Sequence, residues 1–550
     1  MQLSKSIAVR SFSVAIAIIF LLITIAAGTE NVHAASKLKV TPGSSNIYVG
    51  KTVSLKANTN VKWSVSKGKG IVKLTSSKKK SVKVKGLKTG VAYITAKSGK
   101  QSSKVKIVVA KKGAPLSIKL MSSKEIIGPG ETCNVSVLSV KPESASDKVS
   151  FSSSDDSIAE VTPGGLVTGN NIGTVKITAR SKADRNVAAS IVLEVVDAKA
   201  GVVTATIDMS NASKYPAGKA VKAWFPVPIS DENQTVSNVK FTVADKDKTH
   251  AEISKPVSGA AYSRDKVFYV EFAPDIAPAD RKATLSFHVY RRAVSHSTDL
   301  RSKEKGSVDK EKFAEYLQET TYSGSLTEGI VKETADKIVA DANAKTVYDK
   351  AHAIYLWIAE NITRDKSLPN RELGDVVAVL SGQRDAGSCI DINSIFVALC
   401  NAEGIPARDS FGLKLQEVPG QNCRAEFYLP GYGWVEVDPA MPLGKIMYKE
   451  SEYRGQDAPN AAEWEVIKET YWNTGSPSWM CLTHGRDLTF EPKQSASPEY
   501  MVNPDGTLNH LMFPYGEYNG RYIEGWGPTY DKTFNYVYTF EEEDPRDCGC

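Results

Sequence analysis

The spacing of apolar residues changes sharply near residue 300, and this change limits the folds that the 550-residue chain can adopt. Before that point, short segments alternate apolar with polar residues and are separated by Gly, Ser and Asn, as is typical of β-sheets. After it, apolar residues recur every three or four positions, which indicates helices, and strands return after Arg408. The length exceeds what one hydrophobic core can hold. We therefore expect a multidomain protein with all-β domains first and an α+β domain after them.

Two copies of one β pattern occupy the first 200 residues. The first copy contains VKWSVS and TGVAYITAKS, and the second contains VSFSSSDDSIAEV and GLVTGNNIGTVKITARS. Evenly spaced short strands in tandem indicate β-sandwiches. The order of these motifs resembles the bacterial immunoglobulin-like group 2 (BIG2) family, which implies surface spacer or adhesion modules. We expect two immunoglobulin-like sandwiches, at 35–113 and 114–198, and a further all-β domain at 199–300.

The N-terminus has the features of an export signal. Lys5 and Arg10 precede an apolar run over residues 14–27, and an A-x-A-like site, Val32-His33-Ala34-Ala35, follows. This pattern predicts a signal peptide over residues 1–34 and a secreted or cell-surface, cell-wall-associated protein. The alternative is a retained membrane anchor, although the run is short for a membrane span. No membrane span is expected after signal cleavage.

Charge is distributed unevenly along the chain. Residues 35–113 contain 20 Lys and no Asp, Glu or Arg; with +7 overall and +1 in the leader, residues 114–550 carry −14. Such asymmetry suggests that the basic module binds anionic cell-wall or surface polymers. Nucleic acid is not expected, because few aromatic residues lie among these lysines. The alternative is a solvated lysine surface that protects strand edges from pairing.

The segment 385–408, DAGSCIDINSIFVALCNAEGIPAR, contains the best candidate nucleophile. A turn of small residues precedes a helix that Gly404 ends before Pro406. Cys389 therefore falls in the first helical turn, where unpaired N–H groups and the helix dipole stabilise a thiolate. The alternatives are a small buried hydrophobic residue or half of a disulfide.

A predicted hairpin, QNCRAEFYLPGYGWVEVDPA over residues 421–440, brings further polar groups together. Alternation places Asn422, Arg424 and Glu426 on one face of the first strand, and the second strand ends at Asp438. Asn422 and Asp438 then lie on adjacent strands. A thiol at a helix start, a polar group on one strand and an Asp on the next match the arrangement of a nucleophile, its base and an orienting carboxylate.

These two segments, G-S-C-x-D-x-N and C-R-A-E-F-Y-L-P-G-Y-G-W-V-x-V-D-P, resemble the bacterial transglutaminase-like (transglutaminase/protease core) superfamily. The resemblance implies a papain-like α+β fold over residues 301–545, a peptide or protein substrate, Cys389 as the nucleophile and Asp438 as the orienting carboxylate. The family's base is a His four residues before Glu426, and Asn422 occupies that position here. An amide has no titratable proton near neutral pH, so Asn422 cannot act as a general base.

The expected function is thiol-dependent acyl transfer or hydrolysis on peptide or protein amides through Cys389. The alternatives are a pseudoenzyme that binds a ligand in the same cleft and a structural adhesin. His484 and His510 lie beside family-like motifs and are the candidates for a substitute base. No cofactor or metal is expected, because no C-x-x-C or H-x-x-x-H spacing occurs. Whether an active form hydrolyses, crosslinks or deamidates is left open.

Two further expectations concern helices and cysteines. Helical periodicity marks residues 308–320, 329–344 and 346–365. The seven cysteines are an odd number, so at least one thiol is free or pairs between chains. The C-G-C sequence in the tail, 546–550, is compatible with a disulfide, a metal site or an intermolecular link.

Overall fold

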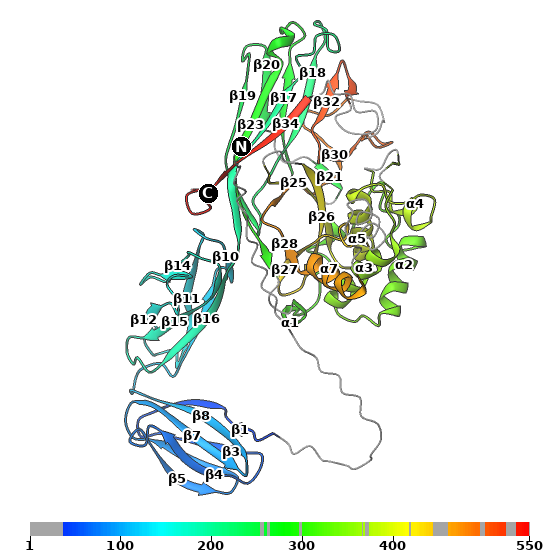
Figure 1. The fold of residues 1–550 in the computed structure, drawn as a ribbon. Helices are drawn as coiled ribbons and strands as arrows, with labels where there is room; N and C mark the ends of the chain where they lie inside the picture. Colours follow the sequence, from blue (N-terminus) through cyan, green and yellow to red (C-terminus); the bar gives the residue numbers. More distant parts are fainter. Residues whose placement is uncertain are drawn as a thin grey trace, which may run out of the picture. The chain divides into compact units, whose positions relative to one another are not determined.

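The computed structural model describes residues 37–253, 258–260, 265–295, 300–365, 367–368, 373–416, 420–443, 460–495, 501–523 and 535–548. They form two compact units, one ending at Lys112 and one beginning at Gly113, which we describe separately. The predicted signal peptide lies outside the described residues. In the part of the chain described, no helix has the length and apolar character needed to cross a membrane. The predicted mixture of all-β domains and one α+β domain is confirmed (Figure 1).

The first unit is a sandwich of two four-stranded sheets. One has the order β1-β3-β6-β5 and the other β2-β8-β7-β4. Leu55, Val82, Val84, Ile94 and Ile107 are fully buried between the sheets, because every second residue of each strand faces inward. The strands are β1 Val40–Thr41, β2 Ser44–Tyr48, β3 Thr52–Ala57, β4 Lys62–Lys67, β5 Val72–Lys78, β6 Ser81–Gly86, β7 Gly90–Ser98 and β8 Gln101–Ala110.

The second unit begins with a sandwich of the same kind. Its sheets have the orders β10-β16-β15-β12 and β13-β14-β11-β9, around a core that includes Val135, Val167, Ile177 and Leu193. The strands are β9 Ser117–Ser122, β10 Ile126–Ile127, β11 Thr132–Lys141, β12 Val149–Ser152, β13 Ala159–Val161, β14 Leu166–Gly169, β15 Gly173–Ser181 and β16 Ala188–Val195.

The next all-β block is completed by strands from the C-terminal end of the chain. Its sheets have the orders β19-β23-β17-β34 and β20-β22-β18-β32-β33. The whole of β34 pairs with β17, from Ala200 opposite Glu543 to Asp208 opposite Asn535, and the two run side by side in Figure 1. The strands are β17 Ala198–Asp208, β18 Val221–Val227, β19 Gln234–Val243, β20 Thr249–Ile253, β22 Lys266–Phe272, β23 Lys282–Arg292, β32 Tyr515–Tyr518, β33 Arg521–Ile523 and β34 Asn535–Glu543.

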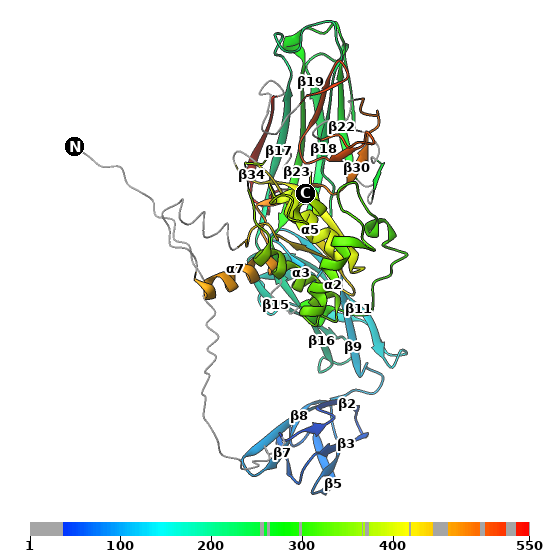
Figure 2. The same cartoon turned by 90° about the vertical axis from the view of Figure 1, so that its right-hand side faces the viewer.

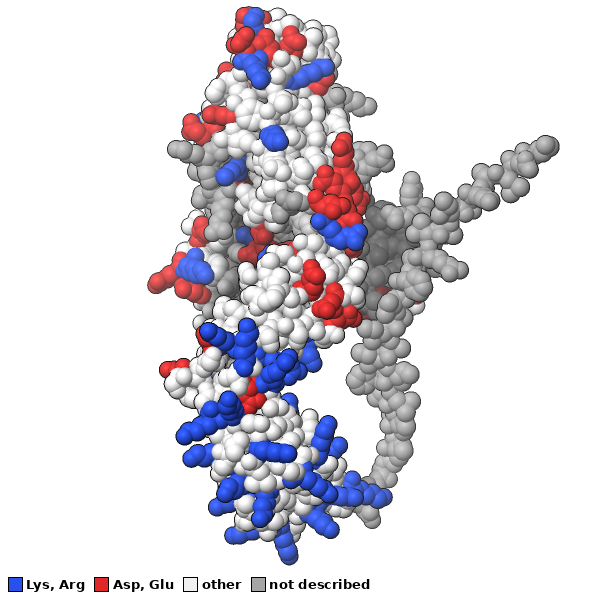
Figure 3. All heavy atoms as spheres, turned by 90° about the vertical axis from the view of Figure 1, so that its left-hand side faces the viewer, with Lys and Arg blue, Asp and Glu red and all other residues white. Residues whose placement is uncertain are grey.

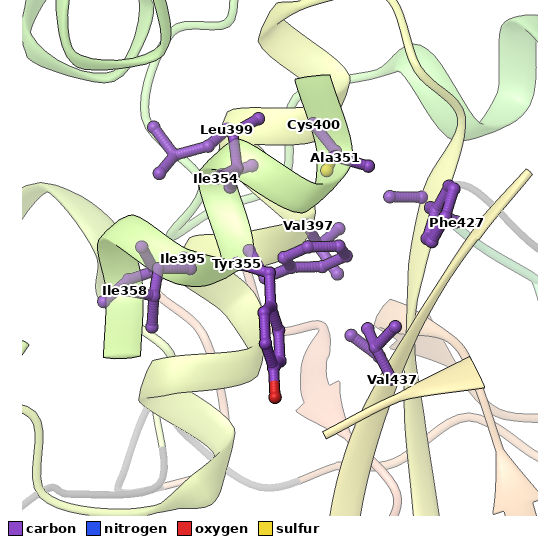
Figure 4. Close-up of a cluster of buried hydrophobic side chains, with 14 of the residues drawn as sticks. Ala351, Ile354, Tyr355, Ile358, Ile395, Val397, Leu399, Cys400, Phe427 and Val437 are labelled. Carbon is purple, nitrogen blue, oxygen red and sulfur yellow. The ribbon is translucent and has the colours of Figure 1, made fainter. Parts of the chain in front are cut away.

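Helices and a four-stranded sheet of order β27-β26-β25-β29 form the α+β part. Figure 1 shows α2, α3, α4 and α5 grouped beside β25 and β26, and Figure 2 shows α2, α3 and α5 close together in a second view. In Figure 4, Tyr355 and Ile358 of α3 meet Leu399 of α5 and Phe427 of β26 in a buried core. The main elements are α2 Gly329–Asp341, α3 Val347–Asn361, α4 Val376–Leu380, α5 Cys389–Ala402, α7 Ala461–Asn473, β25 Ala407–Lys414, β26 Gln421–Leu429, β27 Gly433–Val437 and β29 Trp479–Thr483.

Small elements join the larger ones. They are β21 Ser258–Ala260, β24 Val294–Ser295, β28 Thr474–Gly475, β30 Arg486–Thr489, β31 Leu508–His510, α1 Leu300–Lys303 and the 3-10 turns η1 Pro278–Asp280 and η2 Ala314–Leu317. The helices predicted over 329–344 and 346–365 are confirmed as α2 and α3. The helix predicted over 308–320 is wrong, because only η2 forms there. Phe313 and Tyr316 pack instead against Trp434, so tertiary aromatic contacts outweigh the helical periodicity.

Candidate functional site

Cys389 is the first residue of α5, as the sequence predicts. The helix is capped by Ser388, whose Oγ accepts a hydrogen bond from the N–H of Ile390 at 3.1 Å. The Cys389 thiol is free and half-buried, and it packs beside Phe411 and Cys423. The disulfide alternative for Cys389 therefore does not hold in this structure. A half-buried thiol at a capped helix start has both a stabilising dipole and access from solvent.

Asp391 holds the turn that precedes the nucleophile. Its carboxylate is fully buried and accepts backbone hydrogen bonds from Gly387 at 2.7 Å and Gly374 at 2.9 Å. Arg384 adds two bonds, both at 2.9 Å. These four bonds tie the turn before Cys389 to two other segments of the chain. The sequence reasoning missed this role, although Asp391 stands only two residues after Cys389 and Arg384 five residues before it.

The predicted hairpin is confirmed, with β26 and β27 joined by a turn over residues 430–432. Cys423, Phe427 and Leu429 face the helices and are fully buried. Ala425 pairs with Val437, which places Asp438 opposite Arg424 and two residues away from Asn422. The structure thus brings Asp438 and the Asn422 position onto neighbouring strands, in a diagonal relation.

The side chains of Asn422 and Asp438 differ in their polar contacts. Within the described residues, the Asn422 amide makes no hydrogen bond, and its main-chain carbonyl accepts one from Trp479 Nε1 at 3.1 Å. Asp438 is buried and lies 3.9 Å from Arg424 Nε. Its Oδ1 accepts the N–H of Ala440 at 3.2 Å. Burial raises the pKa of Asp438 to about 6, against the opposing charge of Arg424.

A buried charge network lies beside Asp438. The Glu436 carboxylate is bonded by the guanidinium groups of Arg291 and Arg424. Burial opposes ionisation of Glu436, but the two arginines outweigh it and hold its pKa below the usual value. The Arg424 guanidinium also lies 4.6 Å from the centre of the Trp479 ring. Arg424 therefore has several fixed partners on the face of β26 that carries Asn422.

The two histidines considered as substitute bases are engaged elsewhere. His484 Nδ1 lies 2.9 Å from the carbonyl of Asp409, and its Nε2 lies 3.5 Å from Cys481 Sγ. His510 stacks on Phe411 with ring centres 4.8 Å apart, and burial and the charge of Arg486 push its pKa well below the usual value. Among the residues described, no imidazole nitrogen is hydrogen-bonded to Cys389 Sγ.

A solvent-open hollow of about 410 Å³ adjoins the nucleophile turn. Asn361, Thr363, Arg384 and Asp385 contribute its polar wall. Asp385 directly precedes the turn of residues 386–388, so the hollow lies within a few residues of Cys389 along the chain. Its volume lies within the range of small-ligand pockets.

The described residues also include one group of possible metal ligands and several free thiols. Ligand atoms of His288, Glu543 and Cys548 lie within 4.8 Å of one another. Cys548 is disulfide-bonded, and a disulfide sulfur is not the thiolate that metals require, so we assign no metal there. Cys550 lies outside the described residues. The expectation of a free thiol is confirmed at Cys133, Cys389, Cys400 and Cys481.

Comparison with known proteins supports both resemblances. The transglutaminase-like superfamily matches residues 332–439, which include Cys389, Asn422 and Asp438. The bacterial Ig-like domain (group 2) matches residues 116–192. These matches confirm a transglutaminase-like core together with an immunoglobulin-like module.

Among individual proteins, an uncharacterized protein of Haemophilus influenzae is 29% identical over 347 residues, which cover 57% of this chain and 84% of that protein. A crystal structure of a candidate cysteine protease from Cytophaga hutchinsonii is 16% identical, covers 62% of this chain and 98% of its own, and has a TM-score of 0.32. The periplasmic domain of TgpA from Pseudomonas aeruginosa is 13% identical, covers 45% and 93%, and has a TM-score of 0.23.

Proposed function

We propose that this is an exported protein in which Cys389 carries out thiol-dependent acyl transfer on peptide or protein substrates. The observation that supports this most directly is the free, half-buried Cys389 thiol at the capped start of α5, held by the four hydrogen bonds of Asp391. Export is supported by the leader-like N-terminus and by the immunoglobulin-like group 2 module.

The proposed reaction has two covalent steps. The Cys389 thiolate attacks the substrate carbonyl carbon, a C–S bond forms, and the C–N bond breaks as the amine leaves. Water or a second amine then attacks the thioester, which releases an acid or a new amide and restores the thiol. A leaving amine must be protonated, and with Asn422 in place of the family His that proton comes from solvent. Acylation by esters, whose leaving groups need less assistance, is therefore expected to be much faster than acylation by amides.

A second candidate is a pseudoenzyme that uses the same fold to bind a ligand and leaves Cys389 unreacted. It is favoured by Asn422, whose side chain cannot serve as a base, and by Asp438, whose charged neighbour is Arg424 rather than an imidazole. In that case the hollow beside residues 382–385 binds a peptide side chain without reaction at Cys389.

One experiment separates the two candidates. Purified protein lacking residues 1–34 is incubated with a p-nitrophenyl ester and with a peptide amide, and intact-mass spectrometry detects acyl-enzyme. The panel comprises wild type, Cys389→Ser, Asn422→His and Asn422→Gln. We expect wild type to form an adduct with the ester that Cys389→Ser lacks, and Asn422→His to increase amide turnover by about 100-fold or more.

The matched variant Asn422→Gln changes the length of the side chain without adding a titratable group, so its rates should stay close to those of wild type. Absence of an ester adduct on Cys389 in both wild type and Asn422→His refutes the acyl-transfer proposal. Peptide binding without an adduct then supports the pseudoenzyme.

A further inference from the structure

The first module, residues 37–112, carries twenty positive side chains and no negative ones. Its 20 Lys are all exposed, and it contains no Asp, Glu or Arg. In Figure 3, the visible face of this module, at the bottom of the view, shows many blue side chains spread over a white surface and no red. The module has its own buried core and forms a compact unit.

The immunoglobulin-like fold itself does not require this charge. Residues 114–198 build the same kind of sandwich with 8 Lys and Arg and 10 Asp and Glu, a net charge of −2. Both modules belong to one chain and share its route of export. The excess of lysine is therefore specific to the first module and needs an explanation of its own.

Protection of strand edges accounts for only part of the lysines, since the edge strands β4 and β5 together contain four. The edge strands are β1, β5, β2 and β4, and the first and third of these contain no Lys. Six lysines lie instead on central strands, where both neighbours are already paired and no edge exists to protect. They are Lys56, Lys83, Lys85, Lys97, Lys104 and Lys106.

Two pairs of lysines lie directly opposite each other. Lys73 pairs in register with Lys85 in one sheet, and Lys62 pairs with Lys97 in the other. Like charges at such positions destabilise a sheet, and the described part of the module has no acid to neutralise them. A bound polyanion neutralises these lysines and removes the repulsion between them, which contributes favourably to the free energy of binding.

We propose that the first module binds a flexible anionic polymer of the cell envelope, with phosphodiester or carboxylate groups. Lys83 and Lys85 lie on the outer face of one sheet, while Lys104 and Lys106 lie on the outer face of the other. Sheets that pack face to face turn these outer faces to opposite sides. A flat or rigid partner reaches only one of them, whereas a flexible chain wraps around both.

The residue types favour an envelope polymer over nucleic acid. Lysine is a compact, hydrated point charge, while the planar arginine that suits bidentate phosphate recognition is absent. Single-stranded nucleic acid also binds through exposed aromatic rings on which its bases stack. In this module Trp63 is buried, and Tyr48 and Tyr93 are half-buried. The module therefore offers charge without a stacking platform.

The test uses the chain without residues 1–34. The protein is titrated with three fluorescently labelled polymers of equal charge number: poly(glycerol phosphate), polygalacturonate and single-stranded DNA. Each titration is repeated at about 0.05, 0.1 and 0.2 M NaCl, where salt screening changes substantially. We expect affinity for at least one envelope-type polymer to fall steeply with salt, with a slope of about −0.7 per contacted charge. The phosphate and carboxylate arms identify which group is preferred.

Triple variants on each face, with Arg counterparts and a control, examine the geometry. Replacement by Gln of Lys56, Lys83 and Lys85, or of Lys97, Lys104 and Lys106, is expected to weaken binding by about 10- to 100-fold in each case, since each contacted charge contributes roughly fivefold near 0.1 M salt. The same positions changed to Arg should retain binding. The matched control replaces the exposed lysines Lys119, Lys176 and Lys182 of the second module and should have no effect.

Several results overturn the proposal. The first is the absence of binding to both envelope-type polymers at about 0.05 M NaCl. The second is that only one of the two Gln triples weakens binding. The third is that DNA of equal charge binds more tightly than either envelope-type polymer. Circular dichroism of each variant establishes that the sandwich is still folded, so a loss of affinity cannot be attributed to unfolding. None of these readouts depends on Cys389, and failure here leaves the proposed acyl transfer untouched.

Discussion

Replacing Asp391 by Asn tests whether its carboxylate fixes the turn before Cys389. Asp391 accepts two backbone bonds and two guanidinium bonds at 2.7 to 2.9 Å, with no exposed surface. An Asn keeps one acceptor oxygen, but its NH₂ group faces one backbone N–H and one N–H of Arg384. Two bonds are lost and the buried carboxylate charge that faces the Arg384 guanidinium is removed, which should cost about 3 to 5 kcal/mol.

Alkylation of Cys400 measures this loss within α5 itself. Cys400 is a free thiol with no exposed surface, and it reacts only when the helix opens. A loss of 3 kcal/mol or more corresponds to a Cys400 alkylation rate that is higher by at least about 100-fold, provided that opening is fast relative to reaction. Rates are read by peptide mass spectrometry with iodoacetamide at fixed pH.

The matched control is Asp385→Asn, the same change at an exposed carboxylate six residues earlier. Its effect on Cys400 should stay within about twofold, as is usual for a surface substitution. If Asp391→Asn protects Cys400 as well as wild type does, the turn does not depend on the Asp391 carboxylate, and our account of how the nucleophile is positioned is refuted.

Three further predictions follow from buried or opposed charges. Burial raises the pKa of Asp438 to about 6, so the folded state binds this proton more tightly than the unfolded chain does, and stability is lost as pH rises from about 4 through 6. The free energy of unfolding of Asp438→Asn, measured in urea, should therefore exceed that of wild type by about 2 to 3 kcal/mol at pH 8 and equal it at pH 4. Glu436→Gln leaves two buried guanidinium groups without their shared carboxylate and should lower the free energy of unfolding by about 3 kcal/mol. The same change at the exposed Glu542 should lower it by less than about 1 kcal/mol. Lys73→Glu replaces repulsion with attraction opposite Lys85, and hydrogen exchange of β5 and β6 should show about 0.5 to 1 kcal/mol of added stability that added salt removes.

Local sequence patterns were sufficient where the structure is determined locally. The start of α5 follows from a turn of small residues before an apolar face, and its end follows from Gly404, which has a φ of 72° and stops the helix. The hairpin follows from alternation around a Pro-Gly turn. Cys389, the Asn422 position and Asp438 were all placed in this way, because each lies at a position that its own element fixes.

Contacts between distant segments could not be predicted from these patterns. Glu436 is bonded by Arg291, which lies 145 residues earlier in the chain, and Arg384 reaches Asp391 through a turn rather than along a helix. Residues 308–320 show helical periodicity, yet their aromatic side chains pack on Trp434 and prevent a helix. His484 and His510 lie next to family-like motifs, but their rings are held by buried partners that only the folded chain brings together.

The pairing of β34 along β17 has a mechanical consequence. β17 directly follows the second immunoglobulin-like module, and it lies between β23 and β34 with antiparallel neighbours on both sides. Tension that reaches the start of β17 through the second immunoglobulin-like module acts along the strand. The hydrogen bonds to β23 and β34 are then loaded together in shear and do not open one after another. A chain tethered by its N-terminal modules would therefore transmit pulling forces into the domain that carries Cys389 without first detaching its own connecting strand.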